Sequence, residues 1–384
     1  MRSVARLTLL AIVLSLSISA CSQQGSGSAA PGSAGSPSNP GSSGASSATP
    51  DGSSPGGTAG AATSGPPGSV PASGTWARVE VDGPAPEARE DHTWTVDGEG
   101  RTAYLFGGRD GGSVFDDLWA FDLATDAWRQ VPIAGERPAP RFGHEAAWVP
   151  GRGLAVFAGQ AGATFYDDVW LFDPATSAWR LLPAGGSVPV ARYGSCSGIG
   201  PDGRLWISHG FTEDGVRFAD TAAYDFDAEA WTDQAPAGDG PVERCLHACW
   251  WTSDGGFVLY GGQTTNVPAL GDLWLLTPGA GGAPSNRWAK AANPEPAARQ
   301  LTAVARRDSL TVLFGGRDIN RKALADLWLL PDGAAAFVPL EATGPGPAAR
   351  SGATLIHDPV GDRLVLFGGL GDAAFDELWS LTFP

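Results

Sequence analysis

The sequence is poor in charged residues, and above all in basic ones. Charged side chains make up 17% of the 384 residues, and 41 acidic residues against 25 basic ones give a formal net charge of −16. Binding to nucleic acid depends on basic patches that neutralise phosphate groups. The shortage of lysine and arginine therefore argues against a nucleic-acid partner.

A long apolar run is also missing. The apolar stretch Leu7–Ile18 is shorter than the roughly 20 residues that a membrane-spanning helix needs, but it has the length of a signal-peptide core. It follows Arg2 and Arg6 and ends in Ile18-Ser19-Ala20-Cys21, which resembles a bacterial lipobox. The resemblance implies a lipoprotein signal peptide over residues 1–20, lipidation of Cys21 and export to the cell envelope, with the outer membrane as the destination in a diderm cell. The alternative is an ordinary secretory peptide cut near Ala20.

Aromatic residues are absent between Cys21 and Trp76, where Ser, Gly, Ala, Pro and Thr dominate. Such a segment has too little apolar surface to offset the entropy lost on ordering, so we expect residues 21–74 to be a disordered tether. A spacer without a tuned length is the alternative. The remaining residues, 75–384, form the folded domain.

Residues that break helices are abundant. The 54 glycines and 31 prolines argue against a helical bundle. What the folded region contains instead is one unit repeated six times. Paired glycines, or a close equivalent, follow an apolar run at steps of 51, 51, 52, 54 and 53 residues: Gly107-Gly108, Ala158-Gly159, His209-Gly210, Gly261-Gly262, Gly315-Gly316 and Gly368-Gly369.

Each unit reads as four short strands. In the first unit these are His92–Val96, Ala103–Phe106, Leu118–Asp122 and Trp128–Val131, separated by turn residues. Four strands in a period of about 50 residues are typical of a propeller blade. The pattern Pro-x-x-Arg-x-x-His, Gly-Gly, Asp-x-Trp and a closing Trp resembles the kelch repeat. The fold class predicted is therefore all-β, a six-bladed propeller of four-stranded antiparallel blades.

The two ends of the folded region complement each other. The sixth unit stops at Pro384 before a fourth strand, whereas a spare strand with its own Trp stands at Thr75–Val79. We expect this N-terminal strand to complete blade six, so that no long sheet edge stays open.

An arginine and a carboxylate recur at fixed offsets in every unit. Because both fall at the same end of a blade, a planar guanidinium can pair with the carboxylate. We expect structural ion pairs between two sets of residues: Arg89, Arg141, Arg192, Arg244, Arg299 and Arg350 with Asp117, Asp168, Asp220, Asp272, Asp326 and Glu377. An anion trap lining the channel mouth is the alternative.

Metal and cofactor signals are weak. His92, His144 and His247 each follow an arginine by three residues, but they belong to blades one, two and four, and a metal needs converging ligands. Galactose oxidase has kelch-like repeats and a copper site with a Tyr–Cys crosslink. Here the nearest pair, Tyr193 and Cys196, is too close in sequence for that geometry. We expect no metal and no cofactor.

Three cysteines remain after Cys21. Cys196 and Cys249 fall on the innermost strands of neighbouring blades with opposite parity, so they predict a disulfide. Cys245 would stay outside the bridge, because about 13 Å separates it from Cys249 along one strand. Three buried thiols are the alternative.

The loops after the glycines differ most between units, and binding residues favour loops on a rigid scaffold. This face is the predicted binding site, with plain solvent-exposed loops as the alternative. Its candidate residues are Arg109, Asp110, Gln160, Phe211, Glu213, Gln263, Asn266, Arg317 and Asp318.

No nucleophile–base arrangement stands out, and we assign no catalytic residue. The sequence favours an extracytoplasmic, membrane-anchored module that binds a protein or a glycan. One alternative is an enzyme like the kelch sugar epimerases, with acid–base chemistry at Arg109, Glu213, His209 or Arg317. Another is a structural protein of envelope assembly.

Overall fold

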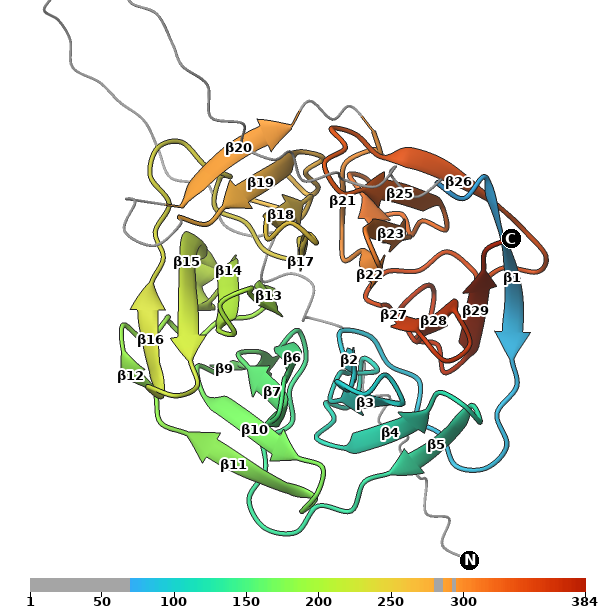
Figure 1. Ribbon diagram of the computed structural model, residues 1–384, viewed down its shortest axis with the longest axis horizontal. Helices are drawn as coiled ribbons and strands as arrows, with labels where there is room; N and C mark the ends of the chain where they lie inside the picture. Colours follow the sequence, from blue (N-terminus) through green and yellow to red (C-terminus); the bar gives the residue numbers. More distant parts are fainter. Residues whose placement is uncertain (1–69, 280–285, 292–294) are drawn as a thin grey trace, which may run out of the picture. The chain divides into compact units, whose positions relative to one another are not determined.

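The computed structural model describes residues 70–279, 286–291 and 295–384. Within these ranges the chain forms β-strands and one short 3-10 turn, η1 (Glu213–Gly215), and contains no α-helix. The strands are rich in aliphatic and aromatic residues and end at turns, as in β3 (Thr102–Phe106), where four of five residues are buried. This part of the chain is an all-β propeller with antiparallel blades, arranged around a central axis (Figure 1).

Units one, two and four each form a four-stranded antiparallel sheet, and unit three forms a sheet of five strands. The strands of these sheets, in chain order, are β2 (Thr93–Val96), β3, β4 (Leu118–Asp122) and β5 (Ala127–Gln130); β6 (Glu145–Val149), β7 (Gly153–Phe157), β10 (Val169–Asp173) and β11 (Ala178–Leu182); β12 (Gly185–Gly186), β13 (Cys196–Ile199), β14 (Leu205–Phe211), β15 (Arg217–Asp225) and β16 (Ala230–Asp233); β17 (Ala248–Trp251), β18 (Phe257–Tyr260), β19 (Leu273–Thr277) and β20 (Arg287–Ala291). The four strands predicted for unit one agree with these bounds to within one residue.

Units five and six differ from the expected pair of separate blades. They share one eight-stranded sheet, because β1 (Ser73–Val79) pairs in parallel with β26 while it also pairs with β29. The strands of this sheet, in spatial order, are β22 (Ala303–Arg307), β23 (Leu310–Phe314), β25 (Leu327–Pro331), β26 (Val338–Thr343), β1, β29 (Leu378–Thr382), β28 (Arg363–Phe367) and β27 (Thr354–Asp358). The predicted all-β propeller of antiparallel blades is therefore confirmed, but the structure does not divide it into six four-stranded sheets.

The first and last strands of the folded region lie side by side. β1 runs antiparallel to β29 with Trp76 opposite Leu381, which is the pairing that the sequence predicts (Figure 1). Trp76 is 4% exposed and meets Phe314 edge-on with 5.4 Å between ring centroids. The N-terminal strand thus contributes a core side chain to the sheet that it completes.

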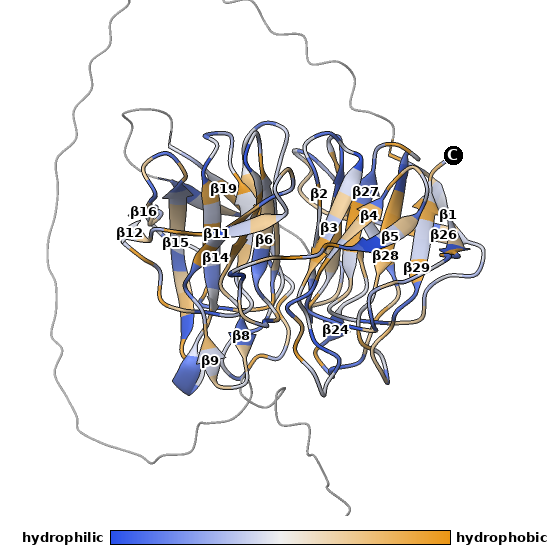
Figure 2. Ribbon diagram, turned by 90° about the horizontal axis from the view of Figure 1, so that it is seen from below, coloured by the Kyte–Doolittle hydropathy of each residue, from blue (hydrophilic) through white to orange (hydrophobic). Residues whose placement is uncertain are grey.

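The apolar core lies between neighbouring units rather than inside one. One cluster joins Trp94 and Trp128 of unit one to Val365 and Phe367 of unit six, and other clusters join successive units in the same way. Figure 2 shows the apolar segments concentrated within the sheets, with polar residues at the loops above and below. Each unit therefore depends on its neighbours for burial of its apolar faces.

A closed ring of backbone hydrogen bonds surrounds the axis. In each unit the residue two positions after the arginine has a positive φ, and its N–H donates to the carbonyl of the same position in the preceding unit. The six donor–acceptor distances are 2.8–3.0 Å, and Asp91 closes the ring onto Gly352. The members of this ring are Asp91, Gly143, Gly194, Leu246, Leu301 and Gly352.

A second contact explains the paired glycines. Gly107 has a φ of +64°, and a Cβ there would lie 2.6 Å from the carbonyl oxygen of Arg141 in the next unit. Gly108 N–H donates to that same carbonyl at 2.9 Å. The glycines thus allow one unit to approach the backbone of the next.

Candidate functional site

The arginine that recurs in each repeat unit is buried and paired with the carboxylate of the same unit. Arg89 is fully buried, and its Nη1 and Nη2 donate to the two carboxylate oxygens of Asp117 at 2.7 and 2.9 Å. The structure brings together all six predicted pairs. Because the arginines are at most 1% exposed, their charges are used within the fold and do not line an open anion site.

The tryptophan two residues after the carboxylate adds to four of these pairs. Trp274 Nε1 donates to Asp272 at 2.7 Å, and the same bond recurs at Trp119, Trp170 and Trp328. Burial alone would raise the pKa of Asp272, but the hydrogen bonds and charge of Arg244 outweigh it and lower that pKa. The Asp272 carboxylate is therefore held ionised as a structural anchor.

The three histidines that follow the arginines are buried packing residues. His144 lies edge-on to Phe106, with 5.2 Å between ring centroids, and its Nε2 is 2.8 Å from Thr93 Oγ1. Burial, helped by the charge of Arg89, lowers the pKa of His92 to about 3, so that ring is neutral. No three His, Cys, Asp or Glu side chains converge on a metal position within the part of the chain that the structure describes.

Cys196 in β13 and Cys249 in β17 form a disulfide between the innermost strands of units three and four. Cys245 lies outside the bridge, is fully buried, and its Sγ accepts a hydrogen bond from Gln263 Nε2 at 3.6 Å. The disulfide forms part of the wall of the central channel.

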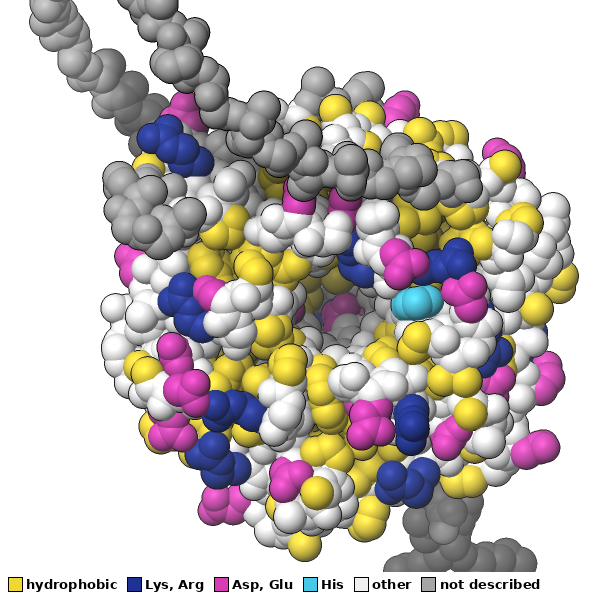
Figure 3. All heavy atoms as spheres, viewed as in Figure 1, with side chains coloured by type: hydrophobic (Ala, Val, Ile, Leu, Met, Phe, Trp, Pro, Cys, Tyr) yellow, Lys and Arg dark blue, Asp and Glu magenta, His cyan; other side chains and the backbone are white. Residues whose placement is uncertain are grey.

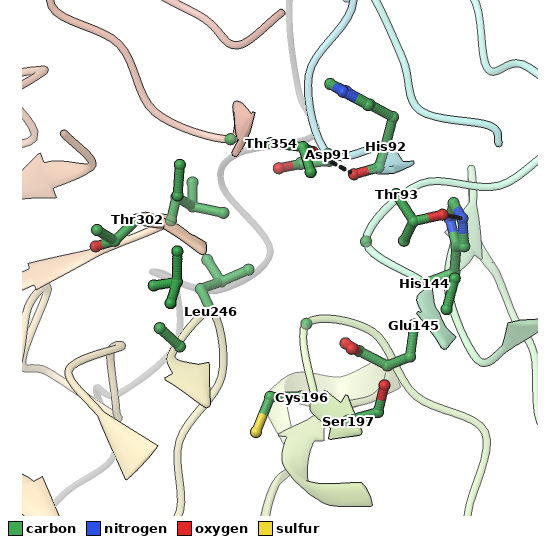
Figure 4. A pocket seen from close by; sticks show the side chains of 18 of the residues that line it. Asp91, His92, Thr93, His144, Glu145, Cys196, Ser197, Leu246, Thr302 and Thr354 are labelled. Carbon is green, nitrogen blue, oxygen red and sulfur yellow. Dashed lines mark hydrogen bonds between the residues drawn. The ribbon is translucent and has the colours of Figure 1, made fainter. Parts of the chain in front are cut away.

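The innermost strands enclose a central cavity of about 280 Å³. Figure 3 shows it as a hollow in the middle of one face, and Figure 4 shows the side chains that line it. Six of the lining residues carry hydroxyl groups, Thr93, Ser197 and Thr302 among them, and the others include aliphatic residues, glycines and the carboxyl groups of Asp91 and Glu145. The chemistry of this cavity is therefore that of hydrogen bonding with little formal charge.

Glu145 and Asp91 are the two carboxyl groups in the lining, and Asp91 is paired with Arg109. Glu145 begins β6 and extends into the cavity beside Ser197 (Figure 4), and Ser195 Oγ lies 3.4 Å from its Oε1. Burial raises the pKa of Glu145 to about 8, although the two serines oppose the shift. At neutral pH this carboxyl group is mostly protonated, so it can both donate and accept a hydrogen bond.

The side chains that directly follow the arginines are buried. These are Glu90, Phe142, Tyr193, Cys245, Gln300 and Ser351, each at most 8% exposed. Arg109 Nη2 donates to Asp91 at 2.8 Å, and its guanidinium lies 4.1 Å from the centre of the Phe142 ring. Burial, with a contribution from Asp91, raises the pKa of Glu90 to about 7.

The predicted binding face divides into exposed and buried members. Asp110, Glu213 and Asn266 are exposed, and Gln160, Arg317 and Asp318 are half-buried. Arg109, Phe211 and Gln263 are not surface residues, since they are 7%, 2% and 8% exposed. For these three the prediction is wrong.

Their burial has a simple cause. The residue after the glycine pair forms a bridge with the residue after the arginine, as in Glu90 with Arg109, Tyr193 with Phe211, and Cys245 with Gln263. Each unit thereby extends its innermost strand pair by one residue beyond the glycines. The exposed residues follow only after this bridge, at Asp110 in unit one, Glu213 in unit three and Thr265 in unit four.

The structure does not assemble the acid–base set considered for an epimerase. His209 is fully buried, with its ring packed against His247 and Trp288, and Arg109 is paired with Asp91. Glu213 is exposed on η1. Glu145 and Glu90 were not predicted from the sequence. Each directly follows a repeat residue, His144 or Arg89. Because side chains alternate along a strand, Glu145 should point away from the buried His144, and this signal could have identified it.

Comparison with known proteins gives a consistent assignment. A family model described as the KLHDC2/KLHL20/DRC7 Kelch-repeats domain matches residues 70–262. The chain is similar to Kelch domain-containing protein 3 of Bos taurus, with 29% identity over 214 residues that cover 52% of this chain and 55% of that protein.

Two further relatives are matched over smaller parts. Acyl-CoA-binding domain-containing protein 4 of Arabidopsis thaliana is 34% identical over 121 residues, which cover 31% of this chain and 18% of that protein. The flagellar outer-arm dynein alpha chain of Chlamydomonas reinhardtii is 29% identical over 197 residues, or 46% of this chain and 4% of that protein. The chain thus spans less than two-thirds of the length of each of these relatives.

Among the described residues, no helix has the length and apolar character needed to cross a membrane. The repeated arginine–carboxylate pairs, the glycine contacts and the propeller of antiparallel blades agree with the family match. On these grounds the chain belongs to the Kelch-repeat family.

Proposed function

We propose that this protein is a binding module whose six-bladed propeller presents one loop face to a protein partner. In this proposal the eight-stranded sheet acts as two blades that β1 joins, so that each repeat unit contributes one sector. A Kelch propeller is consistent with a protein-binding module. The observation that carries the proposal is the contrast within each unit: the repeated residues are buried in fixed contacts, whereas the tips of the loops after the glycines are exposed and differ in sequence.

Export and lipid anchoring form the second part of the proposal. Residues 21–69 lie outside the described residues, so only the lipobox pattern supports this part. Ser73 and Gly74, which the sequence assigned to the tether, belong to β1. The test is a Cys21→Ser variant of the full chain. We expect wild-type protein in the detergent phase after membrane extraction and the variant in the aqueous phase. Equal partitioning of the two proteins would refute the anchor.

Partner binding is tested with the full chain as bait in an envelope extract. One variant carries alanine at the exposed loop positions Asp110, Glu213 and Asn266, and a matched control carries alanine at Glu99 and Asp254 on the turns of the opposite face. We expect the first variant to lose the proteins that both the wild type and the control retain. Identical captured sets would refute the loop face, and binding of glycans alone would replace the protein partner.

A further inference from the structure

The loop of unit five carries a local excess of positive charge in an acidic chain. Arg317, Arg321 and Lys322 fall within six residues, accompanied by one acidic residue, Asp318, whereas the whole chain has 25 basic against 41 acidic residues. Arg321 and Lys322 are exposed. None of the three cations has a carboxylate within 4.0 Å among the described residues. The charge of Arg317 acts on the buried Glu90, whose pKa it lowers. The uncompensated positive charge of this loop therefore lies on Arg321 and Lys322, on the predicted binding face.

The loop is held in a fixed shape by its own backbone. β24 (Arg317–Asp318) pairs with β21 (Arg299–Gln300), and the Asp318 carboxylate accepts hydrogen bonds from the backbone N–H groups of Asn320 and Lys322, both at 2.8 Å. The Arg321 N–H donates to the Asp318 carbonyl at 2.9 Å. The Asp318 carboxylate thus stabilises the turn through its hydrogen bonds, and the loop that carries the cations has a fixed backbone conformation.

Exposed apolar side chains lie on the same end of the propeller. Val216, Val267 and Ile319 are 48%, 37% and 53% exposed on the loops of units three, four and five. Figure 2 places β24 at the same edge as the short strands β8 (Gln160–Ala161) and β9 (Thr164–Phe165), which belong to the equivalent loop of unit two.

Hydrogen bonds connect these loops. Arg217 Nη1 donates to Thr265 Oγ1 at 3.1 Å, which ties the loop of unit three to that of unit four. Gln300 Nε2 donates to the Pro268 carbonyl at 2.9 Å, which ties the loop of unit four to β21. We call the resulting surface the basic–apolar surface and define it by Val216, Val267, Ile319, Arg321 and Lys322.

Charge selects the kind of partner that fits this surface. At physiological ionic strength the screening length is about 8 Å, so carboxylates farther away than this act weakly on a ligand seated at Arg321 and Lys322. The exposed Glu213 and Asp214 precede Val216 in the loop of unit three, so the positive charge is confined to the loop of unit five. Unpaired cations beside exposed aliphatic groups suit a segment that combines carboxylates with apolar side chains. We propose that the basic–apolar surface docks an acidic protein segment that also presents apolar side chains. This inference rests on the proposed binding function and specifies the chemistry of its partner.

The experiment measures binding of the full chain to fluorescently labelled synthetic polypeptides by anisotropy. The probes are a Glu–Tyr copolymer, poly-glutamate and heparin. We expect the Glu–Tyr copolymer to bind more tightly than poly-glutamate, and Arg321→Glu with Lys322→Glu to weaken its binding by about tenfold or more, since two favourable contacts become repulsive. Ile319→Ser should weaken the copolymer and leave poly-glutamate unchanged.

A control with the same change in charge carries Arg129→Glu and Arg180→Glu, both exposed on outer strands of other units. It should bind the copolymer within about twofold of the wild type, because these positions lie on the outer strands β5 and β11 of units one and two and not on the loop of unit five. If the charge reversal disturbs folding, the neutral variant Arg321→Gln with Lys322→Gln replaces it, and it should also weaken binding of the copolymer.

Three outcomes would overturn the inference: no binding of either polypeptide, equal loss in the control, or a preference for heparin. If an envelope protein is captured through the loop face but still binds the Arg321→Glu and Lys322→Glu variant, the basic–apolar surface fails while the proposed function stands.

Discussion

Replacing Glu145 with glutamine tests whether the channel holds a protonated carboxyl group. The pKa of this residue rises from an ordinary value of 4.5 to about 8 because of burial. Between these two pH values the folded state keeps the proton and the unfolded state releases it. Stability therefore falls as pH rises through this window, by up to about 1.4 kcal/mol per pH unit.

Glutamine has a similar shape and does not titrate. The Glu145→Gln variant should thus lose this part of the pH dependence, so that its free energy of unfolding gains on the wild type as pH rises from 5 to 8. Below the ordinary pKa of glutamate both proteins lack the charge, and the difference between them should stay constant.

The assay is urea unfolding followed by tryptophan fluorescence at half-unit pH steps. Glu99→Gln is the matched control, since that side chain is 75% exposed, and it should run parallel to the wild type. The double variant with Glu90→Gln should flatten the profile further, because burial and Asp91 raise the pKa of Glu90 to about 7. If the Glu145→Gln profile also runs parallel to the wild type across pH 5–8, the carboxyl group is ionised in the folded state and the reasoning is wrong.

Three other substitutions test what holds the propeller together. Trp76→Ala should cost about 3–5 kcal/mol in urea unfolding, because a buried core side chain of the joining strand is removed, whereas Thr75→Ala at its exposed neighbour should cost far less. Arg244→Met should cost about 3–5 kcal/mol, because it leaves Asp272 without its partner, and Arg180→Met at a surface pair should cost less than about 1 kcal/mol. Replacing Cys196 and Cys249 with alanine should cost roughly 4 kcal/mol, from the entropy of a loop that spans 53 residues; a loss below 1 kcal/mol would contradict that estimate.

Much of the fold could be predicted because the repeat places the same residue types in the same local roles. Arg89 with Asp117, and its counterparts, can be paired from spacing alone, since four strands per unit fix which ends coincide. The spare strand at Trp76 could be assigned to the last unit for the same reason. The second, parallel pairing of β1 with β26 could not, because it depends on how the chain beyond Leu340 curves toward Ser73 and no residue pattern marks it.

The candidate site was harder to predict, because sequence variation between repeats has two origins. Loop tips such as Ile319 vary because an exposed side chain has few packing constraints. Such positions can therefore hold residues that bind a partner. The residues directly after the arginines also vary, from Glu90 to Phe142 to Ser351, yet each is at most 4% exposed. Their variation therefore lies inside the propeller and does not mark an exposed surface.

Variation between repeats is therefore evidence for a binding surface only where the same position is also exposed. Arg109, Phe211 and Gln263 satisfy the first condition and fail the second, because each continues the ladder beyond its glycine pair. Arg321 and Lys322 satisfy both, and they add charge that no other described residue neutralises within 4.0 Å. This combination makes the loop of unit five, rather than the whole loop face, the part of the propeller where a partner should be sought.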